Sequence, residues 1–463
     1  MPGQTSQASK SSGSLDLTQG PILSRLCIFA APILVGQLFQ TLYNSVDSIV
    51  VGNFVGVLAL SAVSASAVIS MLLVGFFTGL STGASVLFAR LFGAKDYRQL
   101  SDAIHTTVLF SMVLGAVVAL LGILFTPQLL MLVACPEDVY EQALVYLRIY
   151  LIGIFFTSVY NVGAGVLRSV GDSKSPFYYL MLSSCMNIVL DILLVAVLPL
   201  GVAGVAIATI IAQGTSVILV FRKMYGMDVR YAFRFQQMHI NRDLLMQVLN
   251  LGLPAGLQTS ITSISNMFVQ RYINSFSSTA IAGISSAMKI DQFAGMPCSA
   301  IGLAMSTYIG QNIGAGKMKR THKGVGIACL ACAIIVLVVS IPVYIFAPQL
   351  MRLFGTDTDM ITYGTGMLHT IMPVYLVMGA NMLFGGVVRG YGYSKTSMVI
   401  SLFGMVACRQ IWLALSLSYE HTINNVYRCY PIGWIFSALP LVLFYLIYLR
   451  RKYSQDLAKG EQS

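Results

Sequence analysis

Two acidic residues stand inside stretches of sequence that are otherwise apolar and long enough to cross a bilayer. Asp47 has Tyr43 four residues before it, and Asp191 has Asn187 four residues before it. Residues four apart share one face of an α-helix, so each helix would present a polar group beside an acid. A carboxylate at mid-bilayer costs about 2.5–3.5 kcal/mol on insertion scales, and sequences rarely carry that cost without using it. Two such helices facing one interior would form a proton or cation site.

The alternative is that Asp47 and Asp191 form a structural pair, hydrogen-bonded to their neighbours. Low dielectric and a nearby like charge both oppose ionisation of a buried carboxyl pair. If the pair is instead a coupling site, it would bind and release protons near the pH of the cytoplasm, or exchange them for Na⁺, which prefers oxygen ligands. We therefore expect H⁺ or Na⁺ as the coupling ion at these acids, and we expect no other metal site and no cofactor.

The composition places these acids in a polytopic membrane protein. Of 463 residues, 56% are hydrophobic and only 10% are charged, whereas soluble domains average about 25% charged residues. The eight cysteines mostly fall in apolar runs and resemble small apolar residues, not a disulfide framework or a metal site. In a soluble protein a net charge of +11 would suggest nucleic-acid binding, but in a membrane protein the placement of the basic residues matters more than their number. We therefore expect a lipid bilayer as the partner and no nucleic acid.

The apolar runs predict an all-α membrane protein with twelve transmembrane helices, near residues 25–50, 57–82, 103–126, 140–166, 176–197, 203–224, 247–273, 279–303, 324–346, 361–388, 397–418 and 427–450. We expect residues 1–20 to be a disordered tail and residues 21–224 to form an N-lobe of six helices. A cytoplasmic linker, 225–246, would lead to a C-lobe of six helices at 247–452 and a cytoplasmic tail at 453–463.

The basic residues predict the orientation of these helices. Most of the 28 lysines and arginines fall in the two tails and in the even-numbered connections, and the odd-numbered connections are poor in them. The positive-inside rule therefore places both termini in the cytoplasm. An even number of helices requires the two termini to share one side, which agrees.

The two halves of the chain repeat at a constant offset of 221 residues. The stretch 125–129 (FTPQL) returns as 346–350 (FAPQL), and Arg168 returns as Arg389. Each repeat holds six helices, so both halves cross the membrane in the same sense. The two lobes should then be related by a pseudo-two-fold axis along the membrane normal, with the substrate site between them.

Two prolines stand at nearly matching places in the repeats. Pro32 lies in the first predicted helix and Pro254 in the seventh, and each would remove a backbone hydrogen bond and bend its helix. A mobile kink and a simple packing role are both open for these residues.

Other polar residues of the predicted helices are candidates for the substrate chamber. Asn44 and Asn161 could contact substrate, although hydrogen bonds between helices are the preferred interpretation. In the second half, Lys289 and Asp291 lie two apart and point to different sides of one helix, so Arg409 is a candidate partner for Asp291. Alternatively, these basic residues form a cationic chamber wall that selects anionic or zwitterionic substrates.

Taken together, these features resemble the multidrug and toxic compound extrusion (MATE) family, most closely its DinF-like branch. The residues that carry the resemblance are the stretch 40–44 (QTLYN) followed by Asp47, the 168–172 loop, Asn187 to Asp191, and 310–315 (GQNIGA). The resemblance implies that Asp47 and Asp191 are ion-coupling acids and that Tyr43, Asn187 and Thr209 are polar residues around them. Another branch of that family carries a glutamate in the seventh helix, and the region 256–266 here has no acid, so we expect no cation site in the second lobe.

The resemblance also implies a secondary antiporter of a bacterial inner membrane, sufficient as a monomer. It would export small, drug-like organic molecules, antibiotics among them, in exchange for H⁺ or Na⁺ by alternating access. The alternative is a flippase for lipid-linked precursors from the same superfamily, which would need an electropositive cavity in both lobes. An enzyme is not expected, because the chain offers no nucleophile with a base and no Walker motif.

Overall fold

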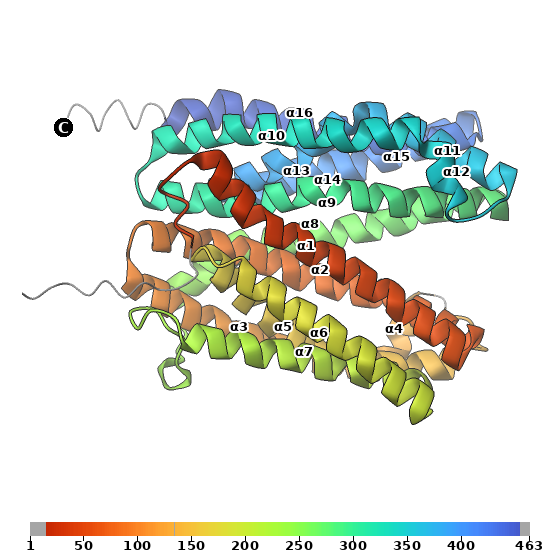
Figure 1. Cartoon of the computed structure of the whole chain (residues 1–463), viewed down its shortest axis with the longest axis horizontal. Coiled ribbons are helices and arrows are strands. Elements are labelled where there is room, and N and C mark those ends of the chain that lie inside the picture. The colour runs from red at the N-terminus through yellow and green to blue at the C-terminus, as the bar shows by residue number, and fades with distance from the viewer. Residues whose placement is uncertain (1–14, 134, 454–463) are drawn as a thin grey trace, which may run out of the picture.

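The computed structural model describes residues 15–133 and 135–453, apart from the side chains of Asn44 and Ser48. Every element in the described residues is helical, and the helices form two bundles lying side by side (Figure 1). In that view α2–α7 form the lower bundle and α8–α16 form the upper one, while α1 runs diagonally from the upper bundle at the left to the lower one at the right.

The N-lobe is built from long helices that are joined by short connections. Its elements are α1 (Ile22–Val50), the π-helix η1 (Val51–Val55), α2 (Val57–Gly93), α3 (Tyr97–Leu124), α4 (Thr126–Leu132), α5 (Tyr140–Ser169), α6 (Lys174–Asp191), the π-helix η2 (Ile192–Val197) and α7 (Gly201–Tyr225).

The C-lobe has the same plan. Its elements are α8 (Arg242–Ile273), α9 (Ser278–Gly314), α10 (Met318–Ile345), α11 (Ala347–Arg352), α12 (Thr358–Ile371), the 3-10 helix η4 (Met372–Val374), α13 (Tyr375–Gly390), α14 (Ser394–Leu402), the π-helix η5 (Phe403–Cys408), α15 (Arg409–Tyr419), α16 (Ile423–Leu443) and the π-helix η6 (Phe444–Leu449). Between the lobes, residues 226–241 hold only the 3-10 helix η3 (Phe235–Gln237).

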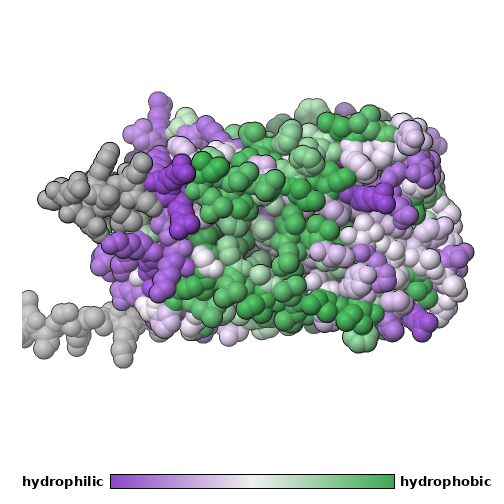
Figure 2. All heavy atoms as spheres, turned by 90° about the horizontal axis from the view of Figure 1, so that it is seen from above, coloured by the Kyte–Doolittle hydropathy of each residue, from purple (hydrophilic) through white to green (hydrophobic). Residues whose placement is uncertain are grey.

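The predicted twelve-span fold is confirmed. Ten spans are long and apolar enough to cross a membrane on length and composition. The other two are α8 and α9, which are long enough but more polar, because they carry residues such as Gln258, Asn266, Lys289 and Asp291. On the face seen in Figure 2, an apolar belt crosses the middle of the molecule and polar residues gather at both ends, as a bilayer-spanning protein requires.

The 221-residue repeat appears in the structure as repeated local geometry. Phe125 and Phe346 each cap a short helix that has a proline in its first two positions, α4 in one lobe and α11 in the other. Gly93 and Gly314 end the long helices α2 and α9. The repeated sequence therefore encodes the same turn at the same place in each lobe.

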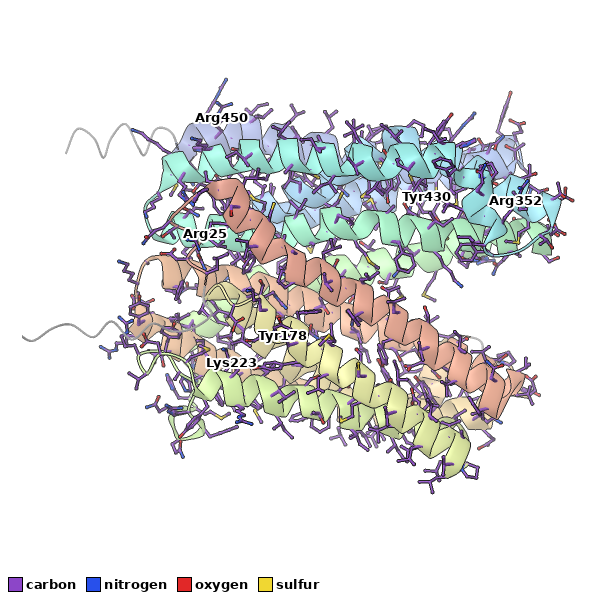
Figure 3. The ribbon with its side chains drawn as sticks, viewed as in Figure 1. Arg25, Tyr178, Lys223, Arg352, Tyr430 and Arg450 are labelled. Atoms are coloured by element: carbon purple, nitrogen blue, oxygen red, sulfur yellow. The ribbon has the colours of Figure 1, made fainter. Side chains whose placement is uncertain are left out.

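The two lobes meet at one end, which we call the basic end because Arg25, Lys223 and Arg450 lie there, whereas Arg352 lies at the far end (Figure 3). The contact follows the pseudo-two-fold symmetry. Gly93 packs on the carbonyl of Gln311, and Gly314 packs on the carbonyl of Arg90. Because Gln311 follows Arg90 by 221 residues, these are equivalent contacts, and the symmetry axis passes between α2 and α9.

Glycines allow α2 and α8 to touch along the half of their length nearer the basic end. A Cβ on Gly252 would lie 2.7 Å from the carbonyl oxygen of Leu80, and one on Gly256 would lie 2.8 Å from that of Phe76. Farther along, the hydroxyl of Ser260 donates to the Leu72 carbonyl at 3.3 Å. Beyond that point Met71 of α2 is 68% exposed, so the helices separate toward the far end.

The prediction of a disordered tail through residue 20 is wrong for residues 15–20, while residues 1–14 lie outside the described chain. Leu17 is fully buried. Its neighbour Leu15 donates through its main-chain amide to the Gly171 carbonyl of the N-lobe at 3.1 Å, and Arg320 of the C-lobe donates to the carbonyls of residues 17, 19 and 20. Polar composition alone predicted disorder, but a buried leucine and a nearby guanidinium fix this segment.

Candidate functional site

The two acids predicted from the sequence lie together inside the N-lobe. The side-chain amide of Asn187 bridges them when it is oriented to satisfy its neighbours: its nitrogen donates to Asp47 Oδ1 at 2.9 Å and to Asp191 Oδ2 at 3.2 Å. Its oxygen accepts from the main-chain nitrogen of Thr209 at 3.2 Å. Three helices, α1, α6 and α7, thus meet at one amide.

Helical spacing and burial explain this arrangement. Asn187 and Asp191 are one turn apart on α6 and are 1% and 0% exposed, so the same face of the helix buries both. Asp191 Oδ1 has no hydrogen-bond partner among the described residues. A buried carboxylate oxygen without a donor is costly, and a proton or a cation at this oxygen would remove the cost.

Tyrosines surround the acid pair. The phenol of Tyr43 interacts with Asp47, as its position one turn earlier on α1 predicts. Tyr146 and Tyr150 stack on each other with ring centroids 5.8 Å apart, and both lie within electrostatic range of Asp47. Sequence reasoning missed this second pair, although its four-residue spacing on α5 is the same signal that singled out Tyr43 and Asp47.

Thr209 joins the cluster differently from what its residue type suggests. Its hydroxyl donates to the Val205 carbonyl of its own helix at 3.0 Å, while its main-chain nitrogen contacts Asn187. Its hydroxyl also lies beside Tyr43.

The structure tests the prediction for only one of the two N-lobe asparagines, Asn161 and Asn44, that were candidates for the substrate chamber. Asn161 accepts from the Thr78 hydroxyl of α2 at 3.3 Å, which joins α5 to α2, while its amide nitrogen donates to the Thr157 carbonyl of its own helix at 2.9 Å. This agrees with the interhelical interpretation. Asn44 lies in α1, and its side chain is outside the described part of the structure.

In the C-lobe, the predicted pairing of Asp291 with Arg409 is wrong. Asp291 accepts from the phenol of Tyr375 at 2.9 Å, and Arg409 donates to the hydroxyl of Ser265 at 2.6 Å. No ion pair within the described residues joins the two charges. Tyr430, seen inside the C-lobe in Figure 3, lies near both.

The prediction that Arg409 lines the chamber is also wrong, because Arg409 is only 1% exposed. A serine hydroxyl and the packing of α8 against η5 and α15 hold it inside the lobe. Lys289, by contrast, is exposed. Residue type could not distinguish the two, since only packing decides which basic side chain is covered.

The lobes are not chemically equivalent at the acid site. The offset of 221 residues maps Asp47 onto Phe268 and Asp191 onto Trp412, so aromatic residues replace both acids. The same offset maps Ile188, beside Asn187, onto Arg409. The C-lobe therefore carries aromatic residues at the positions of the two acids, and a buried guanidinium at the position next to that of Asn187.

The two prolines lie inside continuous helices. Pro32 is within α1 and Pro254 is within α8, where it is buried. A mobile kink at either residue stays a prediction.

The MatE family model matches residues 32–193 and again residues 254–411, once in each lobe. The chain belongs to the MATE family. Within that family it is 30% identical over 434 residues to the "Probable multidrug resistance protein YpnP" of Bacillus subtilis, covering 93% of this chain and 96% of the relative.

Other MATE relatives differ in the cargo that their names state. The chain is 22% identical to the "Multidrug export protein MepA" of Staphylococcus haemolyticus, covering 83% of this chain and 85% of that protein. It is 25% identical to the "FAD transporter" of Shewanella oneidensis, covering 90% and 92%. This MATE protein is accordingly a multi-pass membrane transporter.

Solved structures confirm the fold of this MATE protein. A Pyrococcus furiosus transporter of the MOP superfamily, whose binding pocket is described as having reversed polarity, superposes with a TM-score of 0.88 at 24% identity, over 96% of this chain and 99% of that one. An outward-facing multidrug MATE transporter gives a TM-score of 0.85 at 23% identity, over the same shares of the two chains.

Proposed function

We propose that the protein is a secondary antiporter that exports small organic molecules and is driven by H⁺ or Na⁺ bound at Asp47 and Asp191. The observation that carries the proposal is the side-chain amide of Asn187 between the buried carboxyl of Asp191 and the half-buried carboxyl of Asp47. Two adjacent carboxylates in a low dielectric repel each other, so the site favours one bound proton or cation. Binding and release of that ion would then favour different arrangements of the lobes.

The described arrangement fits one state of such a cycle. We place the basic end in the cytoplasm by the positive-inside rule, in the cytoplasmic membrane of a bacterium. The lobes then touch on the cytoplasmic side, and the exposed Met71 of α2 and Met267 of α8 lie where they separate, on the outer side. We therefore infer an outward-open state, and we propose that a monomer is sufficient because one chain supplies both lobes.

The proposal is tested by transport into inverted vesicles. Ethidium uptake is measured with an imposed proton gradient at constant Na⁺, and then with an imposed Na⁺ gradient at clamped pH. One of the two gradients should drive uptake in the wild-type protein. Asp47→Asn and Asp191→Asn should each lower gradient-driven uptake at least tenfold, because an amide cannot bind and release the ion.

The matched control is Asp138→Asn, which neutralises an exposed acid of the same lobe and should retain uptake. Gradient-driven uptake that persists in the Asp47→Asn, Asp191→Asn double variant would contradict coupling at this site. If neither gradient drives uptake of ethidium or of FAD by the wild-type protein, the antiporter itself is contradicted.

The relative named as an FAD transporter favours a second cargo, a flavin nucleotide. Retention of FAD in vesicles containing the protein, measured with the same gradients, tests it directly. The flippase alternative is less well supported, because the N-lobe holds two acids, the buried Asp191 and the half-buried Asp47, and a lipid-linked pyrophosphate would need positive charge in both lobes.

A further inference from the structure

Lys289 carries a charge at membrane depth, and no acidic residue of the described chain forms an ion pair with it. It is the twelfth residue of α9, roughly 17 Å along the helix from Ser278. Its side chain is exposed, and no hydrogen bond or ion pair joins it to the described residues. Asp291, two residues on, is held by Tyr375 on another side of the helix, so it does not neutralise this lysine.

The angular position of Lys289 around the axis of α9 places its side chain toward the space between the lobes. Gly314 follows it by 25 residues, which is about seven turns at 3.6 residues per turn. Gly314 packs on Arg90 of the N-lobe, and Gly310, one turn earlier, packs on Ala89. The face of α9 that meets the N-lobe at the basic end therefore carries Lys289 where the lobes have separated.

The neighbours of Lys289 on this face supply further ligand groups. Gln292 and Phe293 follow at three and four residues, hence one turn away on the same face, and both are exposed. Phe293 keeps 40% of its surface exposed. An ammonium, an amide and a flat ring thus lie together on one wall.

We propose that Lys289, Gln292 and Phe293 form a binding subsite for an aromatic organic anion, with the carboxylate or phosphate of the cargo at Lys289 and its ring against Phe293. The subsite rests on the proposed transport function and specifies its cargo class. Charge complementarity carries the assignment: a cation at this depth is costly when unpaired, and an anionic cargo would remove that cost. The amide of Gln292 would donate to the second oxygen of the anion.

Binding to the purified protein in nanodiscs of phosphatidylcholine tests the subsite without relying on ion coupling. The probes are pyrene-1-carboxylate and 1-pyrenemethylammonium, which share a ring and differ in charge. Lys289→Gln should weaken binding of the carboxylate about tenfold and leave binding of the ammonium equal or tighter. Lys289→Arg should restore carboxylate binding to within about threefold of wild type.

The control is Arg428→Gln, which removes an exposed charge from α16 in the same lobe and should not change carboxylate binding. The subsite would be overturned if Arg428→Gln weakened carboxylate binding as much as Lys289→Gln, or if Lys289→Gln left carboxylate binding unchanged. Either result would do so even if ethidium transport proceeds. Loss of the Lys289-dependent signal when phosphatidylglycerol replaces a quarter of the lipid would also overturn it, since a lipid headgroup would then be the occupant. Failure of gradient-driven transport with intact carboxylate binding would instead reject only the antiporter.

Discussion

The main-chain amide of Leu17 donates to the side-chain oxygen of Gln311 at 3.1 Å, and the amide nitrogen of Gln311 donates to the Ser169 carbonyl at 2.7 Å. One glutamine of the C-lobe thus holds both the N-terminal segment and the N-lobe. Since Leu15 is bound to Gly171, residues 15–20 act as a strap across the closed end. Opening of this end must break the strap's contacts with at least one lobe.

Removing the guanidinium of Arg320 should loosen the strap. Arg320→Ala deletes donors to three carbonyls, and hydrogen bonds to charged groups contribute about 1.5–3 kcal/mol when buried and less at a partly exposed site. We expect the Leu15 and Leu17 amides to exchange with deuterium about tenfold faster. Arg98→Ala, at an exposed position on α3, should leave exchange unchanged, and equal exchange in both variants would contradict the role of the strap.

The glycine contact between α2 and α8 should control which end is open. Gly256→Leu cannot be accommodated against the Phe76 carbonyl, so the closed end should be forced apart. Spin labels at Arg98 and Lys323, exposed residues of the two lobes, should report a longer distance, and transport should fall at least tenfold. Gly326→Ala adds a methyl group where nothing lies within 4 Å, and it should change neither measurement.

Asn187 and Thr209 should differ strongly in their effect on coupling. Asn187→Leu removes the amide that bridges the two carboxyls, and gradient-driven uptake should fall at least tenfold. Thr209→Ala keeps the main-chain nitrogen that contacts Asn187, so uptake should fall no more than about threefold. Comparable losses in the two variants, measured at equal protein levels, would mean that the threonine hydroxyl itself is required.

The stability of the C-lobe around Asp291 should depend on the hydrogen bond from Tyr375 and not on a charge pair with Arg409. Tyr375→Phe leaves a partly buried carboxyl without its donor, at a cost toward the lower end of about 1–3 kcal/mol, which thermal unfolding in detergent would report as a lower midpoint. Exchanging the charges, Asp291→Arg with Arg409→Asp, should be at least as destabilising as either single change. Recovery of stability by the exchange would show a direct pairing of these two residues.

The sequence predicted the elements of this fold well because membrane helices are encoded locally. Apolar runs set the spans, and the 221-residue repeat set the symmetry. The helix ends were less well predicted: α2 and α9 continue for about ten residues beyond their predicted ends, since helical structure extends beyond the apolar layer at the basic end.

Residues one turn apart on one helix could be grouped correctly, as Tyr43 with Asp47 shows. Relationships across helices could not be derived in this way. The partners of Asp291 and Arg409 depend on helix rotation within the C-lobe, and the order of residues 15–20 depends on Arg320, some 300 residues away. Patterns in one segment do not contain that information.

The π-helical segments have a mechanical consequence for the charged residues beside them. The segment η2 begins directly after Asp191, and η5 ends directly before Arg409. A π turn holds one residue more than an α turn, so its conversion to α-helix would rotate the adjoining stretch by about 100° without breaking the span. Each lobe thus has a π-helical turn, with one extra residue, next to its buried ionisable residue. A change of that turn to α-helix would rotate the side chain while both ends of the helix keep their positions.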